Sequence, residues 1–174
     1  MIKERRSVRT YLDEKVKKED VLEILENARF APSWCNLQIA RYTIVQDVEL
    51  LDKIANECFK EFEHNKKIVS NVKNLAVLTR KVGKCGRLGK YTSPRPGEWE
   101  AFDSGISCQN FCLAAWEKSI GTCVLGIYDE EVLASLINLK EDETISAVIT
   151  FGYIEKQEAP LPKRLSAQDI STFM

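Results

Sequence analysis

The sequence lacks a long hydrophobic segment and an excess of charge of either sign. No apolar run approaches the roughly 20 residues that a membrane-spanning helix needs, and the first residues, Met-Ile-Lys-Glu-Arg, contain no signal-peptide core. We therefore expect a cytoplasmic protein that does not enter membranes. The net charge is -1, so no global positive field favours nucleic acid, and any anion site must be local.

Metal-binding motifs are also lacking. The chain has one histidine, His64, and six cysteines, none of them in a CxxC motif. Their gaps match neither zinc nor iron–sulfur sites. Cys108 and Cys112 are four residues apart on a predicted helix, but no second thiol pair accompanies them. We predict no metal site, reduced and mostly buried thiols, and a surface position for His64.

The glycine-rich centre, residues 81–99, lacks both common phosphate-loop patterns. A Walker loop needs a glycine five residues before Gly89 and a serine or threonine after Lys90, but Lys84 and Tyr91 occupy those positions. The GxGxxG pattern is absent as well. We interpret this segment as a mobile surface loop and as a candidate cover for a site.

The N-terminal stretch Arg5-Arg6-Ser7-Val8-Arg9 places three guanidinium groups and one hydroxyl within five residues. The fork of an arginine matches phosphate oxygens in a way that lysine does not. One interpretation is a clamp for the phosphate of a nucleotide or flavin. The other is a solvated basic tail, and the stretch by itself favours the tail.

Hydrophobic spacing predicts the secondary structure of one globular domain, residues 1–174. We expect helices over residues 21–30, 48–62, 103–118 and 129–137 and strands over residues 41–45, 74–79, 122–127 and 144–151. Asp103 is the expected N-cap of the third helix and Gly121 the residue that closes it. This helix is apolar nearly all round, which predicts a central, buried position.

The connections are too few and too irregular for a doubly wound sheet. We therefore expect an α+β fold in which helices sandwich one mixed or antiparallel sheet. The tail from Glu155 is polar, carries Pro160 and Pro162, and has few core residues. We interpret it as an arm that packs on a partner subunit.

Five stretches together resemble the FMN-dependent nitroreductase family, of which this chain would be a short member. They are, in order, Arg5–Arg9, Pro32–Gln38, Gly121–Gly126, Phe151–Tyr153 and Lys163–Arg164. None is specific alone, but chance is a poor explanation for all five in order. The resemblance favours the phosphate clamp over the basic tail, and it implies a homodimer with FMN at the interface.

In that family the N-terminal basic stretch and a basic pair in the tail hold the FMN phosphate and ribityl chain. Here these roles fall on Arg5, Arg6, Ser7, Arg9, Lys163 and Arg164. Five cations exceed what one phosphate dianion needs, so some of them should face solvent or carboxylates.

The family's loop after the first helix reaches the flavin of the other subunit. By position this implies flavin contacts for Pro32, Ser33, Asn36 and Gln38, with short amides suiting a pyrimidine edge. The usual Gln-Pro-Trp is replaced by Gln38-Ile39-Ala40, which leaves the shape of the loop end in doubt. The glycine-rich turn against the flavin ring corresponds to Gly121–Gly126, which implies flavin contacts for Val124, Leu125 and Gly126. The backbone N–H groups of Leu125 and Gly126 are the best candidates to approach N5.

The resemblance implies an NAD(P)H:acceptor oxidoreductase that reduces quinones or nitroaromatics by ping-pong exchange at the flavin. Because the cofactor carries the chemistry, no catalytic side chain is expected. Trp34, Trp99 and Phe102 either line the acceptor cavity or serve as packing or dimer contacts. Two alternatives stay open: a non-catalytic FMN-binding or redox-sensing protein, and a same-fold enzyme for reductive dehalogenation or flavin breakdown.

Overall fold

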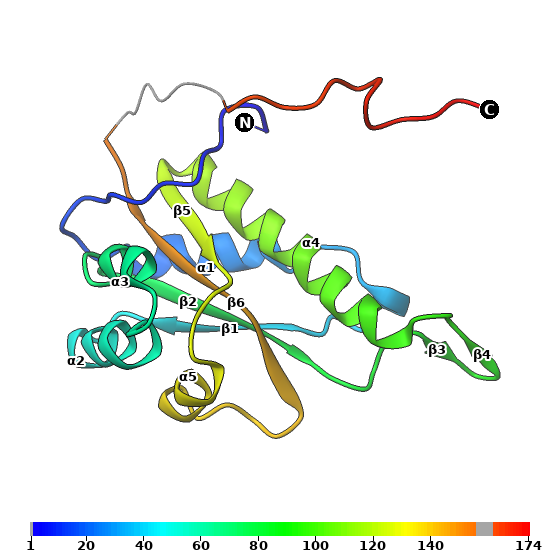
Figure 1. Ribbon diagram of the computed structural model, residues 1–174, viewed down its shortest axis with the longest axis horizontal. Helices are drawn as coiled ribbons and strands as arrows, with labels where there is room; N and C mark the ends of the chain where they lie inside the picture. Colours follow the sequence, from blue (N-terminus) through cyan, green and yellow to red (C-terminus); the bar gives the residue numbers. More distant parts are fainter. Residues whose placement is uncertain (1, 156–161) are drawn as a thin grey trace.

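The computed structural model describes residues 2–155 and 162–174. At its centre is a four-stranded antiparallel sheet with the spatial order β1-β2-β6-β5 (Figure 1). The strands are Ala40–Val45 (β1), Leu75–Lys81 (β2), Ile120–Leu125 (β5) and Glu143–Tyr153 (β6). Ser7 adds one parallel bridge to Thr122 of β5. The predicted α+β fold with a mixed or antiparallel sheet is confirmed.

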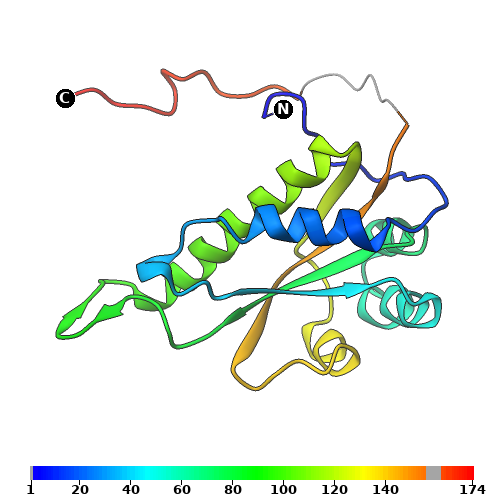
Figure 2. The ribbon, with the colours of Figure 1, turned by 180° about the vertical axis from the view of Figure 1, so that it is seen from behind.

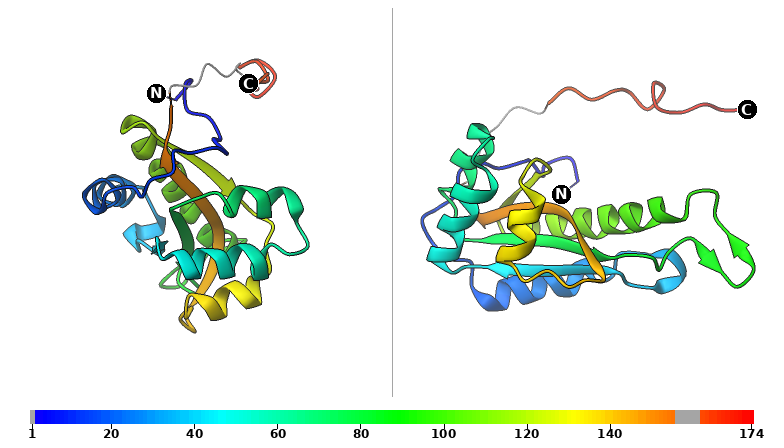
Figure 3. Two further views of the ribbon diagram at one scale, coloured as in Figure 1. Left: turned by 90° about the vertical axis from the view of Figure 1, so that its left-hand side faces the viewer. Right: turned by 60° about the horizontal axis from the view of Figure 1, so that its bottom comes forward.

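Helices cover both faces of the sheet, so the molecule has three layers (Figure 3, left). Lys18–Ala28 (α1) and Pro96–Glu117 (α4) lie on one face, and Val48–Lys53 (α2), Glu63–Val69 (α3) and Glu130–Leu136 (α5) lie on the other. Successive side chains of β2 alternate between the layers: Leu75 and Val77 join one core, Ala76 and Leu78 the other. A strand buried on both faces therefore carries a continuous apolar run.

Helix α4 differs from its prediction at both ends. It begins at Pro96, which occupies the first turn, where its missing N–H has no helical partner to lose. Asp103 is therefore a buried residue inside the helix, and the predicted N-cap is wrong. The helix ends before Ser119, a left-handed residue (φ 58°), while Gly121 belongs to β5. One face of α4 is exposed, with Phe102 59% accessible, so burial all round is also wrong.

The predicted helix over residues 48–62 is broken. After α2 the backbone makes a wider turn, Ile54–Cys58, and α3 starts only at Glu63. In a continuous helix the carbonyl of Cys58 would accept the N–H of Phe62. Instead it accepts the N–H of Asp129 at 2.8 Å, and Phe62 bonds to the carbonyl of Phe59 at 2.9 Å. A tertiary contact with the segment before α5 thus ends the helix.

The central segment contains a small β-hairpin, Arg87–Leu88 (β3) and Tyr91–Thr92 (β4), which projects beyond the N-terminal end of α4 (Figure 1). The segment thus contains regular structure that the prediction of a loop did not include. Residues 162–174 run outside the layers (Figure 2). Pro160, which was named as part of the expected arm, lies outside the described residues. No helix in residues 2–155 or 162–174 has the length and hydrophobicity to cross a membrane.

Candidate functional site

The N-terminal basic stretch is docked on the sheet. The N–H of Val8 donates to the carbonyl of Thr122 at 2.9 Å, and the Val8 side chain is only 2% exposed. It lies over Gly121, where an added Cβ would come within 2.7 Å of the Val8 side chain. The hydroxyl of Tyr11 bonds to the Val8 carbonyl and to Thr150 of β6. Residues 7–11 are therefore a fixed element of the fold.

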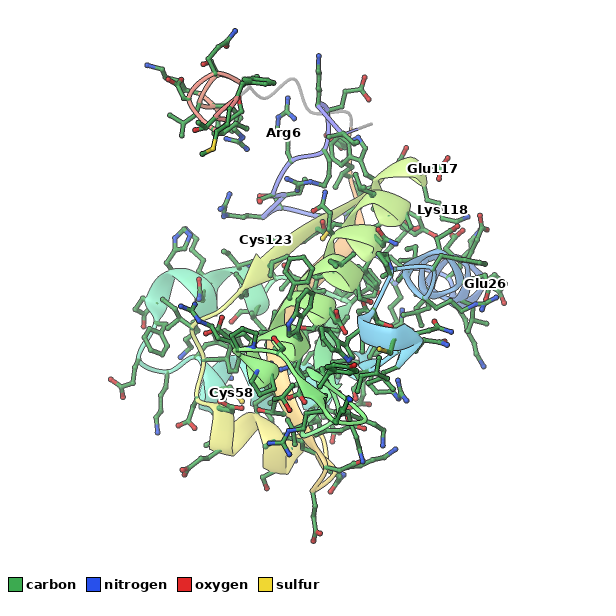
Figure 4. All side chains as sticks on the ribbon, turned by 90° about the vertical axis from the view of Figure 1, so that its right-hand side faces the viewer. Arg6, Glu26, Cys58, Glu117, Lys118 and Cys123 are labelled. Atoms are coloured by element: carbon green, nitrogen blue, oxygen red, sulfur yellow. The ribbon has the colours of Figure 1, made fainter. Side chains whose placement is uncertain are left out.

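The three arginines differ in what they contact. One terminal nitrogen of Arg6 donates to the carbonyls of Lys3, Glu4 and Arg5 at 2.7, 2.6 and 2.9 Å. The Arg6 side chain therefore holds the backbone of the preceding residues in a turn. Figure 4 shows Arg6 above β5, on which Cys123 lies. Burial raises the pKa of the Cys123 thiol, and the nearby positive charges of Arg9 and Arg5 oppose that shift. Arg5 and Arg9 thus bring their charges close to β5.

A cavity of about 570 Å³ lies between the N-terminal segment and α3. Its lining includes three basic side chains, Arg9, His64 and Lys67, together with Tyr11 and one carboxylate, Asp13. Its volume is within the range of roughly 300–1,000 Å³ that small-molecule sites occupy. We call it the cationic cavity, because its charge suits an anionic ligand.

The end of β5 lies beside α3. Val124 is 46% exposed and Leu125 only 6%, as expected where one side chain points out and the next into the core. Gly126 follows the strand and is exposed, and an added Cβ there would meet nothing within 4 Å. The amide of Asn65 in α3 donates to the carbonyl of Ile127 at 3.1 Å, which fixes this turn next to the helix.

The loop over residues 32–38 has an unusual backbone. Cys35, Asn36 and Gln38 all have positive φ angles of 47–57°, a region that residues other than glycine adopt with some strain. Two hydrogen bonds hold this shape: the N–H of Gln38 donates to the Ser33 hydroxyl at 2.9 Å, and the N–H of Trp34 donates to the carboxylate of Asp103 at 2.8 Å.

Asp103 also accepts a long hydrogen bond, 3.5 Å, from the Cys85 thiol. Burial, together with this carboxylate, raises the pKa of Cys85 to about 12, so the thiol stays protonated and remains a donor. Pro32, Ser33 and Gln38 line a second cavity of about 290 Å³, while the Asn36 side chain is exposed outside it. The buried carboxylate of α4 thus anchors a strained loop.

One chain does not bring all the predicted site residues together. The N-terminal segment and the 32–38 loop lie towards opposite ends of the molecule (Figure 1, dark blue and light blue). Lys163 and Arg164 are exposed in the tail, and among the described residues the Arg164 guanidinium bonds only to the neighbouring Lys163 carbonyl at 3.3 Å. What the chain does combine is the basic stretch, the β5 turn and helix α3.

Sequence reasoning missed the contribution of α3. His64 is exposed, as predicted, but it lines the cationic cavity with Lys67. No local pattern indicates this, because the break that turns α3 towards the N-terminal segment depends on the contact between Cys58 and Asp129. The anchoring role of Asp103 was missed for a similar reason, since it was assigned to a helix end.

Comparison with known proteins identifies the family. The model of the nitroreductase family matches residues 2–153, nearly the whole chain. The chain belongs to the nitroreductase family. The match covers the docked basic stretch, the 32–38 loop and the β5 turn.

Individual relatives agree with this membership. A protein of Archaeoglobus fulgidus, named as a candidate NADH dehydrogenase or NAD(P)H nitroreductase, is 31% identical over 157 residues, covering 88% of this chain and 83% of its own. The crystal structure of a candidate NADH oxidase from Clostridium acetobutylicum superposes with a TM-score of 0.78 at 27% identity, covering 98% and 96% of the two chains. A nitroreductase-family structure from Desulfovibrio desulfuricans, solved with FMN, shares the fold at a TM-score of 0.77 and 23% identity, covering 99% and 94%.

Proposed function

We propose that this nitroreductase-family protein is an FMN-dependent oxidoreductase that passes electrons from NAD(P)H to quinone or nitroaromatic acceptors. In the quinone reaction NAD(P)H is oxidised to NAD(P)⁺, and the quinone takes up two electrons and two protons, one of them from solvent. The observation that carries the proposal is the docked basic stretch, which pairs with β5 at Thr122 and contributes Arg9 to the lining of the cationic cavity.

The residues around this cavity fit FMN. Arg9 and Lys67 offer cationic donors to a phosphate dianion, His64 adds an imidazole, and Arg5 adds its charge beside β5. The Nε atom of Arg6 is buried and has no partner among the described residues, so it is a further donor without an acceptor. Gly126 leaves open space where a side chain would otherwise stand, which permits close approach of a flat ring.

Each group of residues has its own task in this proposal. Arg5, Arg6, Ser7 and Arg9, with Lys163 and Arg164 of the tail, hold the phosphate and ribityl chain. Val124, Leu125 and Gly126 present the backbone to the ring. FMN supplies the redox chemistry when bound. The side chains therefore need only bind, orient and exclude water, and no side-chain acid or base is assigned.

We also propose a homodimer, in which the 32–38 loop completes the site of the other subunit through Pro32, Ser33, Asn36 and Gln38. Two observations support it. The loop is remote from the N-terminal segment and α3 of its own chain (Figure 1), which line the cationic cavity. In addition, Leu165, Ile170 and Phe173 of the tail are 72–94% exposed, an apolar surface that a partner subunit would cover.

Anaerobic spectroscopy tests the proposal. The purified protein, reconstituted with FMN, should show the flavin absorbance band, and NADH or NADPH should bleach it. Adding a quinone should restore the band without further donor. A protein that takes up no FMN contradicts the whole proposal. A protein that binds FMN but is bleached by neither donor contradicts the oxidoreductase and favours a flavin-binding role.

A further inference from the structure

A third cavity, near the projecting hairpin, has a different chemistry from the cationic cavity. It has a volume of about 380 Å³ and is lined by Ser93, Pro94, Arg95, Glu98, Trp99 and Phe102. These residues belong to the end of the β3–β4 hairpin and the first turns of α4. We call this cavity the aromatic cleft. None of its lining belongs to the basic stretch or to the β5 turn.

Aromatic rings form one wall of the cleft. Trp99 lies 4.8 Å from Trp34 and 5.4 Å from Phe102, measured between ring centroids. The indole N–H of Trp99 donates to the Ser93 hydroxyl at 2.8 Å, which fixes the orientation of the ring. Phe102 is 59% exposed, although large apolar rings are usually buried. Such a wall favours a flat aromatic ligand that can stack on it.

The segment that forms the hairpin is rich in positive charge, and one of its cations, Arg95, lines the cleft. Residues 82–97 contain four cations, Lys84, Arg87, Lys90 and Arg95, and no acidic residue, in a chain whose net charge is -1. All four are exposed. The nearest acid further along, Glu98, lines the cleft and pairs with Arg95 at 3.4 Å, with both side chains 69–75% exposed. Glu100 is buried and accepts the N–H groups of Lys84 and Cys85.

The Arg95–Glu98 pair is too long and too exposed to fix the guanidinium. Exposed ion pairs of this kind contribute little stability, so Arg95 can turn to a stronger acceptor such as a sulfonate or carboxylate. Glu98 would repel the same anion. The two side chains therefore have opposite expected effects on a charged aromatic ligand.

We propose that the aromatic cleft binds planar aromatic acceptors that carry a negative charge, such as sulfonated or carboxylated quinones, with Arg95 contacting the anionic group. This rests on the proposed function in one respect: Trp34 belongs to the 32–38 loop, which is proposed to reach the flavin of the other subunit. A ligand stacked on Trp99, whose ring contacts Trp34, would then lie at the edge of that site.

The test compares 1,4-naphthoquinone-2-sulfonate with uncharged 1,4-naphthoquinone on the FMN-loaded protein. Arg95→Gln should raise the KM for the sulfonate about fivefold, the size of a single exposed charge contact, with kcat unchanged and the KM for the neutral quinone unaffected. Glu98→Gln should lower the sulfonate KM about twofold. Lys53→Gln and Glu49→Gln, exposed on α2, are the matched controls and should change neither KM.

Quenching of tryptophan fluorescence by naphthalene-2-sulfonate measures the cleft without turnover. Quenching that weakens in Arg95→Gln and strengthens in Glu98→Gln supports the cleft even if the protein reduces no quinone, an outcome that would contradict only the proposed function. Equal effects of Arg95→Gln on both quinones, or an effect no larger than that of Lys53→Gln, would overturn the proposal while leaving the oxidoreductase intact.

Discussion

The cationic cavity and the aromatic cleft are built in different ways. The cavity is bordered by a segment that pairs with β5 and by a helix packed on the core, so its charges are fixed by regular structure. The cleft lies between the end of a projecting hairpin and the first turns of α4, and Trp99 in its wall contacts Trp34 of a loop with three left-handed residues other than glycine. This difference suits a cofactor held in one place at one end and exchangeable ligands at the other.

The two regions also differ in what holds them. Backbone pairing to Thr122 and close packing over Gly121 hold the basic stretch. A buried carboxylate, Asp103, and the contact between the Trp34 and Trp99 rings hold the 32–38 loop against α4. If this comparison is right, mutations at one region should leave the other unchanged. Three predictions test it, in order of decreasing effect.

The largest effect is expected from neutralising the basic stretch. Arg5→Gln combined with Arg9→Gln should weaken FMN binding about 100-fold or more, because each charge-assisted hydrogen bond contributes about 1.5–3 kcal/mol. Flavin fluorescence titration of the apoprotein measures the affinity. Lys17→Gln combined with Lys18→Gln is the matched control, since both lysines are exposed before and within the first turn of α1. Equal losses in the two double variants would mean that the arginines act only as general charge.

The next effect is expected at the loop. Asp103→Ala removes the acceptor of the Trp34 N–H and of the Cys85 thiol. It should lower the free energy of unfolding by about 2–3 kcal/mol, because buried donors then lack a partner. Urea unfolding monitored by circular dichroism gives the value.

The control for the loop is Asp52→Ala, whose exposed carboxylate accepts only a local bond from Asn56 within the described residues. It should change stability by less than about 0.5 kcal/mol. A loss in Asp103→Ala no greater than in this control would show that the loop does not depend on the carboxylate.

The smallest effect is expected from crowding the basic stretch. Gly121→Ala places a Cβ 2.7 Å from the Val8 and Ile154 side chains, so the stretch must shift. We expect a loss of about 1–2 kcal/mol in unfolding free energy, the usual range for overpacking, and weaker FMN binding. Gly105→Ala is the control, because its new Cβ in α4 meets nothing within 4 Å and should raise stability by about 0.5–1 kcal/mol. A melting temperature that changes in the same direction for both variants would contradict this packing.

Local pattern predicted the elements whose own residues carry a clear hydrophobic pattern. The apolar spacing of residues 21–28 and the largely apolar, β-branched run of residues 144–151 are sufficient to predict α1 and β6. Asp129 was placed at the start of a helix, and its carboxylate does cap α5 by accepting the N–H of Val132 at 3.1 Å. The start of α4 was missed because Asp103 is also a strong N-cap residue, whereas Pro96 gave the correct position.

By itself the sequence determined the fold class, the family and the basic stretch. Hydrophobic spacing and the order of residues are properties of the chain that require no tertiary contact. Only the tertiary structure decided which charges meet. It placed His64 and Lys67 beside Arg9, because the carbonyl of Cys58 bonds to Asp129 and ends the helix. It also made Asp103 an anchor for a loop some 70 residues earlier. Such contacts join residues far apart along the chain, and no local pattern encodes them.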